Sequence, residues 1–150
     1  MFATRVPCCA QGTKPASPPA ASAATSPARP FSPALAVGDT LYLSGHLGLD
    51  PATGHAPADP QFEAQMVLAS LGKSLQSAGY SMDDLVSVEI YCTDLRLYDT
   101  FNRVYSGLLH TPYPARDFIG VKDLLFGAHF EVMGVAVRNA AATKTIPVKR

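Results

Sequence analysis

The segment Pro114-Ala115-Arg116-Asp117-Phe118-Ile119-Gly120-Val121 predicts an apolar strand with a single arginine near its start. A second apolar segment follows, Phe130-Glu131-Val132-Met133-Gly134-Val135-Ala136-Val137, and contains a single carboxylate. An ion removed from water is strongly destabilising unless it finds a partner. A small anionic ligand is one candidate partner for Arg116. The alternative is a structural ion pair between Arg116 and Glu131.

The residues before this region predict strands and one long helix. Two β-prone runs, residues 31–37 and 40–47, flank Gly38-Asp39, a dipeptide suited to a hairpin turn, so the first strand pair is expected to be antiparallel. Asp59-Pro60 is typical of a helix start. Apolar residues then recur at helical spacing until Gly79, which provides a stop.

Residues 84–93 alternate with a period of two, which predicts a strand with one covered face. The expected outer side chains are Leu85, Ser87, Glu89 and Tyr91. A second helix carries Phe101, Val104, Tyr105 and Leu108 on one stripe. Strands at 116–121 and 130–138 complete a ββαβαββ order, which is an α+β domain with both helices on one face of a mixed sheet. The bare sheet face predicts association with further copies of the chain.

Several motifs, in this order and spacing, resemble the Rid family of reactive-intermediate (enamine and imine) deaminases. The motifs are Arg29-Pro30-Phe31-Ser32-Pro33-Ala34, Leu41-Tyr42-Leu43-Ser44-Gly45, Leu49-Asp50-Pro51-Ala52-Thr53-Gly54, Phe101-Asn102-Arg103-Val104-Tyr105 and Pro114-Ala115-Arg116, followed by Glu131. Together they cover roughly residues 28 to 138. The resemblance implies a chorismate-mutase-like fold that assembles as a homotrimer with sites in the clefts between neighbours.

The resemblance also implies a reaction. Arg116 would hold the carboxylate of an imino or enamino acid, because a planar guanidinium pairs well with a carboxylate. Glu131 would orient a water that attacks the imine carbon and displaces ammonia, leaving a keto acid. An imine is already electrophilic, so neither a metal nor an organic cofactor is implied.

Further substrate-binding positions follow from the resemblance: Phe31, Ser44, Gly45, Asn102 and Phe118. Gly45 could also be a simple bend, and Asn102 a solvated helix residue. His46 lies at the expected pocket wall and is otherwise an ordinary strand-end histidine.

Three positions depart from the family pattern. Phe31 replaces a frequent tyrosine, Asp117 a frequent serine, and Phe118 a small residue. The charge of Asp117 beside Arg116 could compete with a substrate carboxylate. The departures leave the physiological imine open.

Composition narrows the function classes. The chain has 150 residues, with 12 basic and 12 acidic side chains and 47% hydrophobic residues, so it is long enough for one domain with a real core. Zero net charge without a basic run gives no electrostatic reason to bind nucleic acid or an anionic membrane. No apolar stretch is long enough to span a bilayer.

Cysteine and histidine usage predicts no metal site. Cys8, Cys9 and Cys92 lack metal-ligand spacing and are expected to be free thiols in a reducing compartment. Cys92 is expected to be buried, with a redox-sensitive or site-lining thiol as the alternative. The four histidines show no metal-binding pairing.

The predicted organisation is a Pro/Ala/Ser-rich disordered tail (1–27), a Rid-like domain (28–139) and a C-terminal tail (140–150). A cytoplasmic location is expected, and an organellar transit role for the first tail stays open. Two other functions are kept beside the deaminase: a non-catalytic carboxylate-binding or chaperone-like trimer, and an RNA-cleaving protein, which the neutral charge disfavours.

Overall fold

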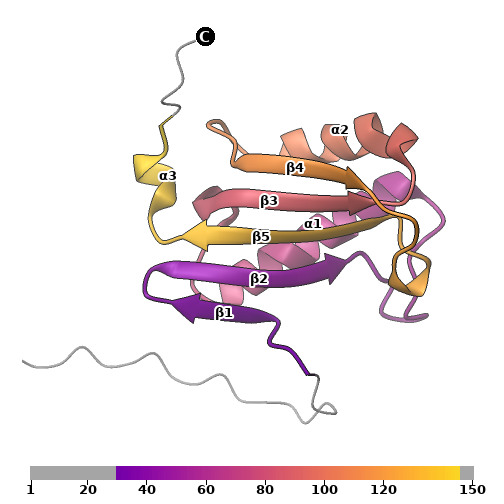
Figure 1. The fold of residues 1–150 in the computed structure, drawn as a ribbon, viewed down its shortest axis with the longest axis horizontal. Helices are drawn as coiled ribbons and strands as arrows, with labels where there is room; N and C mark the ends of the chain where they lie inside the picture. The colour runs from indigo at the N-terminus through magenta and orange to yellow at the C-terminus, as the bar shows by residue number, and fades with distance from the viewer. Residues whose placement is uncertain (1–29, 146–150) are drawn as a thin grey trace, which may run out of the picture. The chain divides into compact units, whose positions relative to one another are not determined.

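The computed structural model describes residues 30–145. The elements follow the predicted ββαβαββ order and end in one extra helical turn (Figure 1). They are β1 (Ala34–Val37), β2 (Thr40–Leu47), α1 (Pro60–Ser77), β3 (Leu85–Cys92), α2 (Tyr98–Leu108), β4 (Ala115–Gly120), β5 (Phe130–Val137) and α3 (Ala140–Thr143). The tail predicted for residues 1–27 lies outside the described residues.

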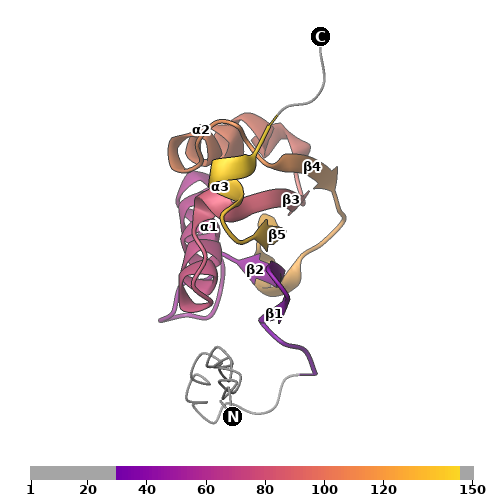
Figure 2. The ribbon, with the colours of Figure 1, turned by 90° about the vertical axis from the view of Figure 1, so that its left-hand side faces the viewer.

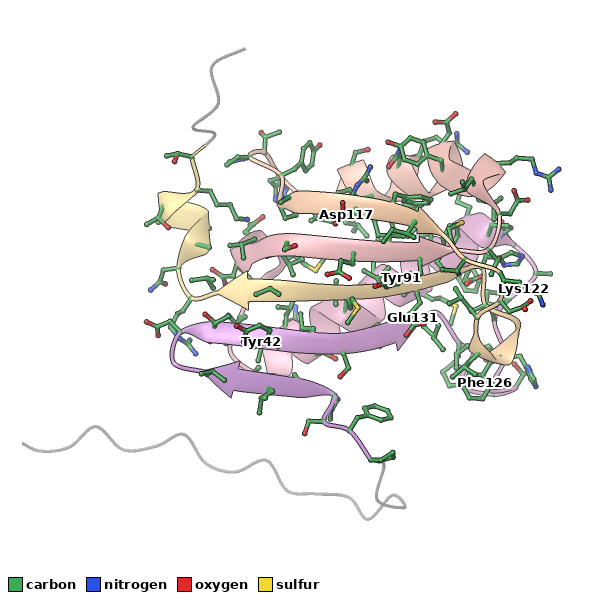
Figure 3. All side chains as sticks on the ribbon, in the orientation of Figure 1. Tyr42, Tyr91, Asp117, Lys122, Phe126 and Glu131 are labelled. Carbon is green, nitrogen blue, oxygen red and sulfur yellow. The ribbon has the colours of Figure 1, made fainter. Side chains whose placement is uncertain are left out.

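The five strands form one mixed sheet in the order β1-β2-β5-β3-β4. Neighbours are antiparallel except β3 and β4, which are parallel. Figure 2 shows α1 and α2 together on one side of the sheet. Within residues 30–145, no helix covers the opposite face (Figure 3). The predicted α+β class with one helical layer is therefore confirmed.

The ends of α1 have the predicted chemistry. The Asp59 carboxylate caps the helix by accepting a hydrogen bond from the Gln61 amide at 3.0 Å, and Pro60 occupies the first turn. Gly79 follows the helix with a φ of +78°, a conformation that glycine adopts readily. The fully buried positions of α1 are Glu63, Ala64, Val67, Leu68, Leu71 and Leu75, so the helix packs flat on the sheet.

Three details of the strand and helix patterns differ from the expectation. β1 begins at Ala34 rather than residue 31. Leu85 is buried rather than outward-facing, because the pairing of β3 with β5 shifts between Leu85 and Ser87. Leu108, expected on the buried stripe of α2, is 45% exposed. A second pairing shift, in β2 between Leu43 and His46, bears directly on the site.

Candidate functional site

Arg116 lies on β4 and projects to the helical side of the sheet. It is the strand partner of Val88, which is 1% exposed in the core. Its Nη1 donates to Asn102 Oδ1 at 2.7 Å and its Nη2 to the Tyr98 hydroxyl at 3.3 Å. The Arg116 Cζ lies 4.9 Å from the ring centroid of Tyr105. Hydrogen bonds and a cation–π contact thus fix the guanidinium against α2.

A cavity of about 380 Å³ lies beside this guanidinium. It is lined by Asn102, Tyr105, Ser106, Tyr113, Pro114 and Arg116. A guanidinium has five N–H donors, and within residues 30–145 two of those of Arg116 are engaged, by Asn102 and Tyr98. The remaining donors allow Arg116 to bind an anionic ligand in the planar, bidentate manner typical of carboxylates.

Glu131 lies on the other face of the sheet. Its neighbour Val132 pairs with Ile90, and Ile90 pairs with Phe118, so these side chains share the helical face with Arg116. Adjacent residues of a strand point to opposite faces. Glu131 therefore points to the uncovered face, where Figure 3 shows it.

Arg116 and Glu131 of the same chain therefore cannot form an ion pair. The structural ion pair considered as the alternative to a ligand is wrong. Strand β3 separates their two strands, which places the β4 and β5 backbones roughly 10 Å apart. A single chain presents the two candidate catalytic groups on opposite sides of its sheet. Within one chain, the two side chains therefore do not face each other across a common cavity.

The Glu131 carboxylate rests on Gly45. A Cβ added to Gly45 would overlap Glu131 Oε1 and would lie 2.8 Å from Cδ. Gly45 falls within the β2 pairing shift, so the strand offers bare backbone where the carboxylate crosses it. Because of this close approach, position 45 has no room for a side chain. Gly45 therefore makes space for the Glu131 carboxylate and is not simply a bend in the strand.

His46 fixes the same irregular stretch of β2. Its Nδ1 lies 2.6 Å from the Ser44 carbonyl oxygen and its Nε2 2.7 Å from Ser74 Oγ on α1. The carbonyl can only accept, so Nδ1 donates and the neutral ring accepts from Ser74 at Nε2. Burial lowers the pKa of His46, although hydrogen bonds to the backbone oppose the shift. His46 therefore holds in place the stretch of β2 that lies against Glu131, a structural role that we call a clamp.

A second clamp, not foreseen from the sequence, involves Glu63. This carboxylate is fully buried, and it accepts hydrogen bonds from the His129 amide at 2.7 Å, the Phe130 amide at 2.9 Å and His129 Nδ1 at 2.6 Å. The anchored amides immediately precede Glu131. The available signal was a glutamate within the apolar stripe of α1, beside Ala64 and Val67.

Around Glu131 the uncovered face is acidic. The Tyr91 hydroxyl donates to Glu89 Oε2 at 2.8 Å, and this hydrogen bond raises the pKa of Tyr91, with smaller contributions from burial and from the charges of Glu89, Glu131 and Asp117. Asp117 lies on this face, opposite the Arg116 side chain (Figure 3). The expectation that Asp117 lies beside the Arg116 guanidinium is therefore wrong.

The other predicted site residues take varied places. Ser44 Oγ donates to the Ser32 carbonyl at 2.6 Å, next to exposed Phe31. Phe118 is half-buried, with its ring centroid 5.0 Å from that of Tyr98 and 5.7 Å from that of Phe101. Asn102, rather than being solvated, holds Arg116.

Cys92 is fully buried, as expected for a structural thiol. Its Sγ–H donates to the Asp94 carbonyl at 3.1 Å, and burial raises its pKa. Among residues 30–145, no three His, Cys, Asp or Glu side chains converge as a metal site. The same residues include no helix that could span a lipid bilayer.

The chain is similar to proteins of one family. The model of the family described as Endoribonuclease L-PSP matches residues 21–138. A RutC family protein of Sinorhizobium fredii is 40% identical over 107 residues, covering 71% of this chain and 85% of that protein. The 2-iminobutanoate/2-iminopropanoate deaminase of Bos taurus is 33% identical over 118 residues, covering 78% and 86%.

Solved structures agree. RidA from an Antarctic Psychrobacter is 32% identical, with a TM-score of 0.69 and coverage of 73% of this chain and 89% of that one. Escherichia coli TdcF with bound serine is 28% identical, with a TM-score of 0.69 and coverage of 75% and 91%. The protein therefore belongs to the Rid family, whose sequence model is described as Endoribonuclease L-PSP.

Proposed function

We propose that this protein hydrolyses reactive imines and enamines derived from amino acids. Water adds to the C=N carbon, the C–N bond then breaks, and the products are a 2-keto acid and ammonia. An enamine reaches the same path after tautomerising to its imine. The observation that carries the proposal is Arg116, a guanidinium fixed by Asn102 and Tyr98 beside a cavity with donors left for a carboxylate.

Glu131 is the proposed acid–base group. Its carboxylate, positioned by Gly45, takes a proton from the attacking water and returns it to the departing nitrogen. General acid–base help of this kind contributes about 10²- to 10⁴-fold to a rate. No other group is needed to make an imine carbon electrophilic.

The site is proposed to form between two copies of the chain. Arg116 and Glu131 point to opposite faces of one sheet, so one chain cannot bring them to the same ligand. A second copy, packed on the uncovered face, can bring its own Arg116 or Glu131 to the first. We take the closed assembly to be a homotrimer, in keeping with the family resemblance, with a small carboxylate-bearing imine as its ligand.

Two similar proteins support the proposal, one by its name and the other by its bound ligand. The Bos taurus relative is called a 2-iminobutanoate/2-iminopropanoate deaminase. The TdcF structure holds serine, which carries the α-carboxylate that Arg116 is proposed to bind. Phe31, Ser44, Gly45 and Phe118 remain proposed substrate-binding positions of the same site.

A coupled assay tests the function. An amino-acid oxidase generates imines from several amino acids, and keto acid and ammonia formation are followed with and without the protein. We expect acceleration that Arg116→Ala abolishes and Arg103→Ala preserves, since Arg103 is an exposed arginine of α2 that donates to Thr100 rather than lining the cavity. Full activity in Arg116→Ala, with assembly intact, would contradict the proposal.

A carboxylate-binding protein without catalysis is the second candidate. The serine-bound TdcF structure favours it, because a bound carboxylate does not require turnover. Calorimetric binding of 2-oxobutyrate that is lost in Arg116→Ala, together with no acceleration of any imine, would select this candidate. RNA cleavage has less support, because the chain has zero net charge.

A further inference from the structure

The cavity beside Arg116 has a defined direction. Phe118, two residues after Arg116, packs on Tyr98 and Phe101 and does not line the cavity. The cavity extends instead toward Tyr113 and Pro114, which precede β4. The side chain of a ligand whose carboxylate is held by Arg116 can therefore extend into this cavity toward Tyr113.

We propose that this cavity receives the substrate's side chain and that it favours imines with large apolar or aromatic side chains over those with a methyl or ethyl group. The inference rests on the proposed function, because it takes Arg116 as the anchor of the substrate carboxylate. Tyr113 and Tyr105 are the specificity-determining residues.

The size and walls of the cavity carry the first step. Its volume of about 380 Å³ lies within the range of pockets that enclose whole small ligands. The rings of Tyr105 and Tyr113 lie 6.2 Å apart between centroids with an interplanar angle of 39°, and buried Pro114 completes an apolar wall. A methyl group would leave these walls largely uncovered, whereas a phenyl ring can contact both tyrosines.

The packing of Tyr105 carries the second step. Tyr105 is 4% exposed, and its ring centroid lies 4.9 Å from Arg116 Cζ and 6.0 Å from the ring centroid of Phe101. The core therefore holds this ring in place between the carboxylate anchor and the cavity. Because the Tyr105 hydroxyl is buried, a ligand in the cavity would contact the ring of Tyr105 and not its hydroxyl.

The test compares imines made from alanine, leucine, phenylalanine and tyrosine by one oxidase of broad specificity. For the unaltered protein, kcat/KM for the phenylalanine imine is expected to exceed that for the alanine imine at least tenfold. Tyr113→Ala should lower this ratio at least fivefold, and Tyr113→Phe should retain it. Tyr105→Phe, which keeps the ring, should also retain the ratio.

Phe62→Ala is the matched control. Phe62 is an aromatic residue of α1 outside the cavity, and its exposed fraction of 51% is close to the 46% of Tyr113. It should leave all ratios unchanged. Equal kcat/KM for the alanine and phenylalanine imines, or an unchanged ratio in folded Tyr113→Ala, would overturn this inference and leave the deaminase proposal standing. Full activity in Arg116→Ala would instead contradict the deaminase proposal itself.

Discussion

The carboxylate of Glu131 lies directly against the backbone of Gly45, in a position that a Cβ atom at residue 45 would occupy. This contact joins β5 to the irregular stretch of β2. Two polar clamps from α1 flank it: Ser74 holds His46, and Glu63 holds the His129 and Phe130 amides. Helix α1 therefore fixes the strands on both sides of the proposed acid–base group.

Gly45→Ala should reduce turnover without preventing folding. The added methyl group displaces the Glu131 carboxylate, and loss of a placed general base lowers a rate by about 10²- to 10⁴-fold. Steady-state kinetics should show the loss in kcat. Gly107→Ala is the control, because a Cβ there meets open space on α2 and should stabilise the helix by roughly 0.5 to 1 kcal/mol. Equal kcat in the Gly45→Ala variant and the unaltered protein would contradict this assignment.

Glu63→Ala should destabilise the fold strongly. The substitution leaves the His129 ring and the His129 and Phe130 amides without their acceptor, and each buried donor left without a partner typically lowers the unfolding free energy by roughly 1 to 3 kcal/mol. Glu63→Gln, which keeps one acceptor oxygen, should lose less. Urea denaturation measures both. Gln65→Ala, at an exposed position of the same helix, should change little, and an equally small change for Glu63→Ala would argue against the clamp.

His46 should make stability depend on pH. Its folded-state pKa lies below the ordinary value of about 6.5, so the unfolded chain binds the proton more tightly. The contribution of His46 is complete above pH 6.5 or so and is lost as pH falls through the folded-state pKa. Denaturation at a series of pH values should give a flatter profile for His46→Gln than for the unaltered protein; parallel profiles would count against this role.

Asn102→Ala should weaken substrate binding. It removes the closest hydrogen bond to Arg116, and hydrogen bonds to charged groups contribute about 1.5 to 3 kcal/mol, which corresponds to roughly a tenfold or greater rise in KM. Thr100→Ala, on the same helix, should leave KM unchanged. Initial rates over a range of imine concentrations provide the comparison, and an unchanged KM in Asn102→Ala would show that Asn102 does not position Arg116.

Local patterns in the sequence predicted most of the fold. The cap at Asp59, the Gly38-Asp39 turn and the apolar stripe of α1 are short-range signals, and each has the expected geometry. The pairing shifts in β2 and β3 were not foreseen, because they depend on which residues of two distant strands align. The prediction that Leu85 faces outward is wrong for this reason.

The resemblance named candidate site residues but not their arrangement. Arg116 and Asn102, two of these candidates, are hydrogen-bonded to each other in the structure. Arg116 and Glu131 point to opposite faces because of their positions relative to the core-facing residues of their strands. These positions are known only once the register of the strands is observed. The buried role of Glu63 was not predictable, because its hydrogen-bond donors lie 66 and 67 residues away in the sequence and meet it only in the fold.

The most direct test of the account mixes two inactive variants. Arg116→Ala and Glu131→Gln chains are produced together in equal amounts, so that they co-assemble, and imine hydrolysis is compared with that of each variant alone. If Arg116 of one copy works with Glu131 of another, about a quarter of the sites in a cyclic oligomer combine both intact residues. Recovery of about that fraction of activity is the predicted result. No recovery in verified mixed assemblies would contradict a site shared between copies.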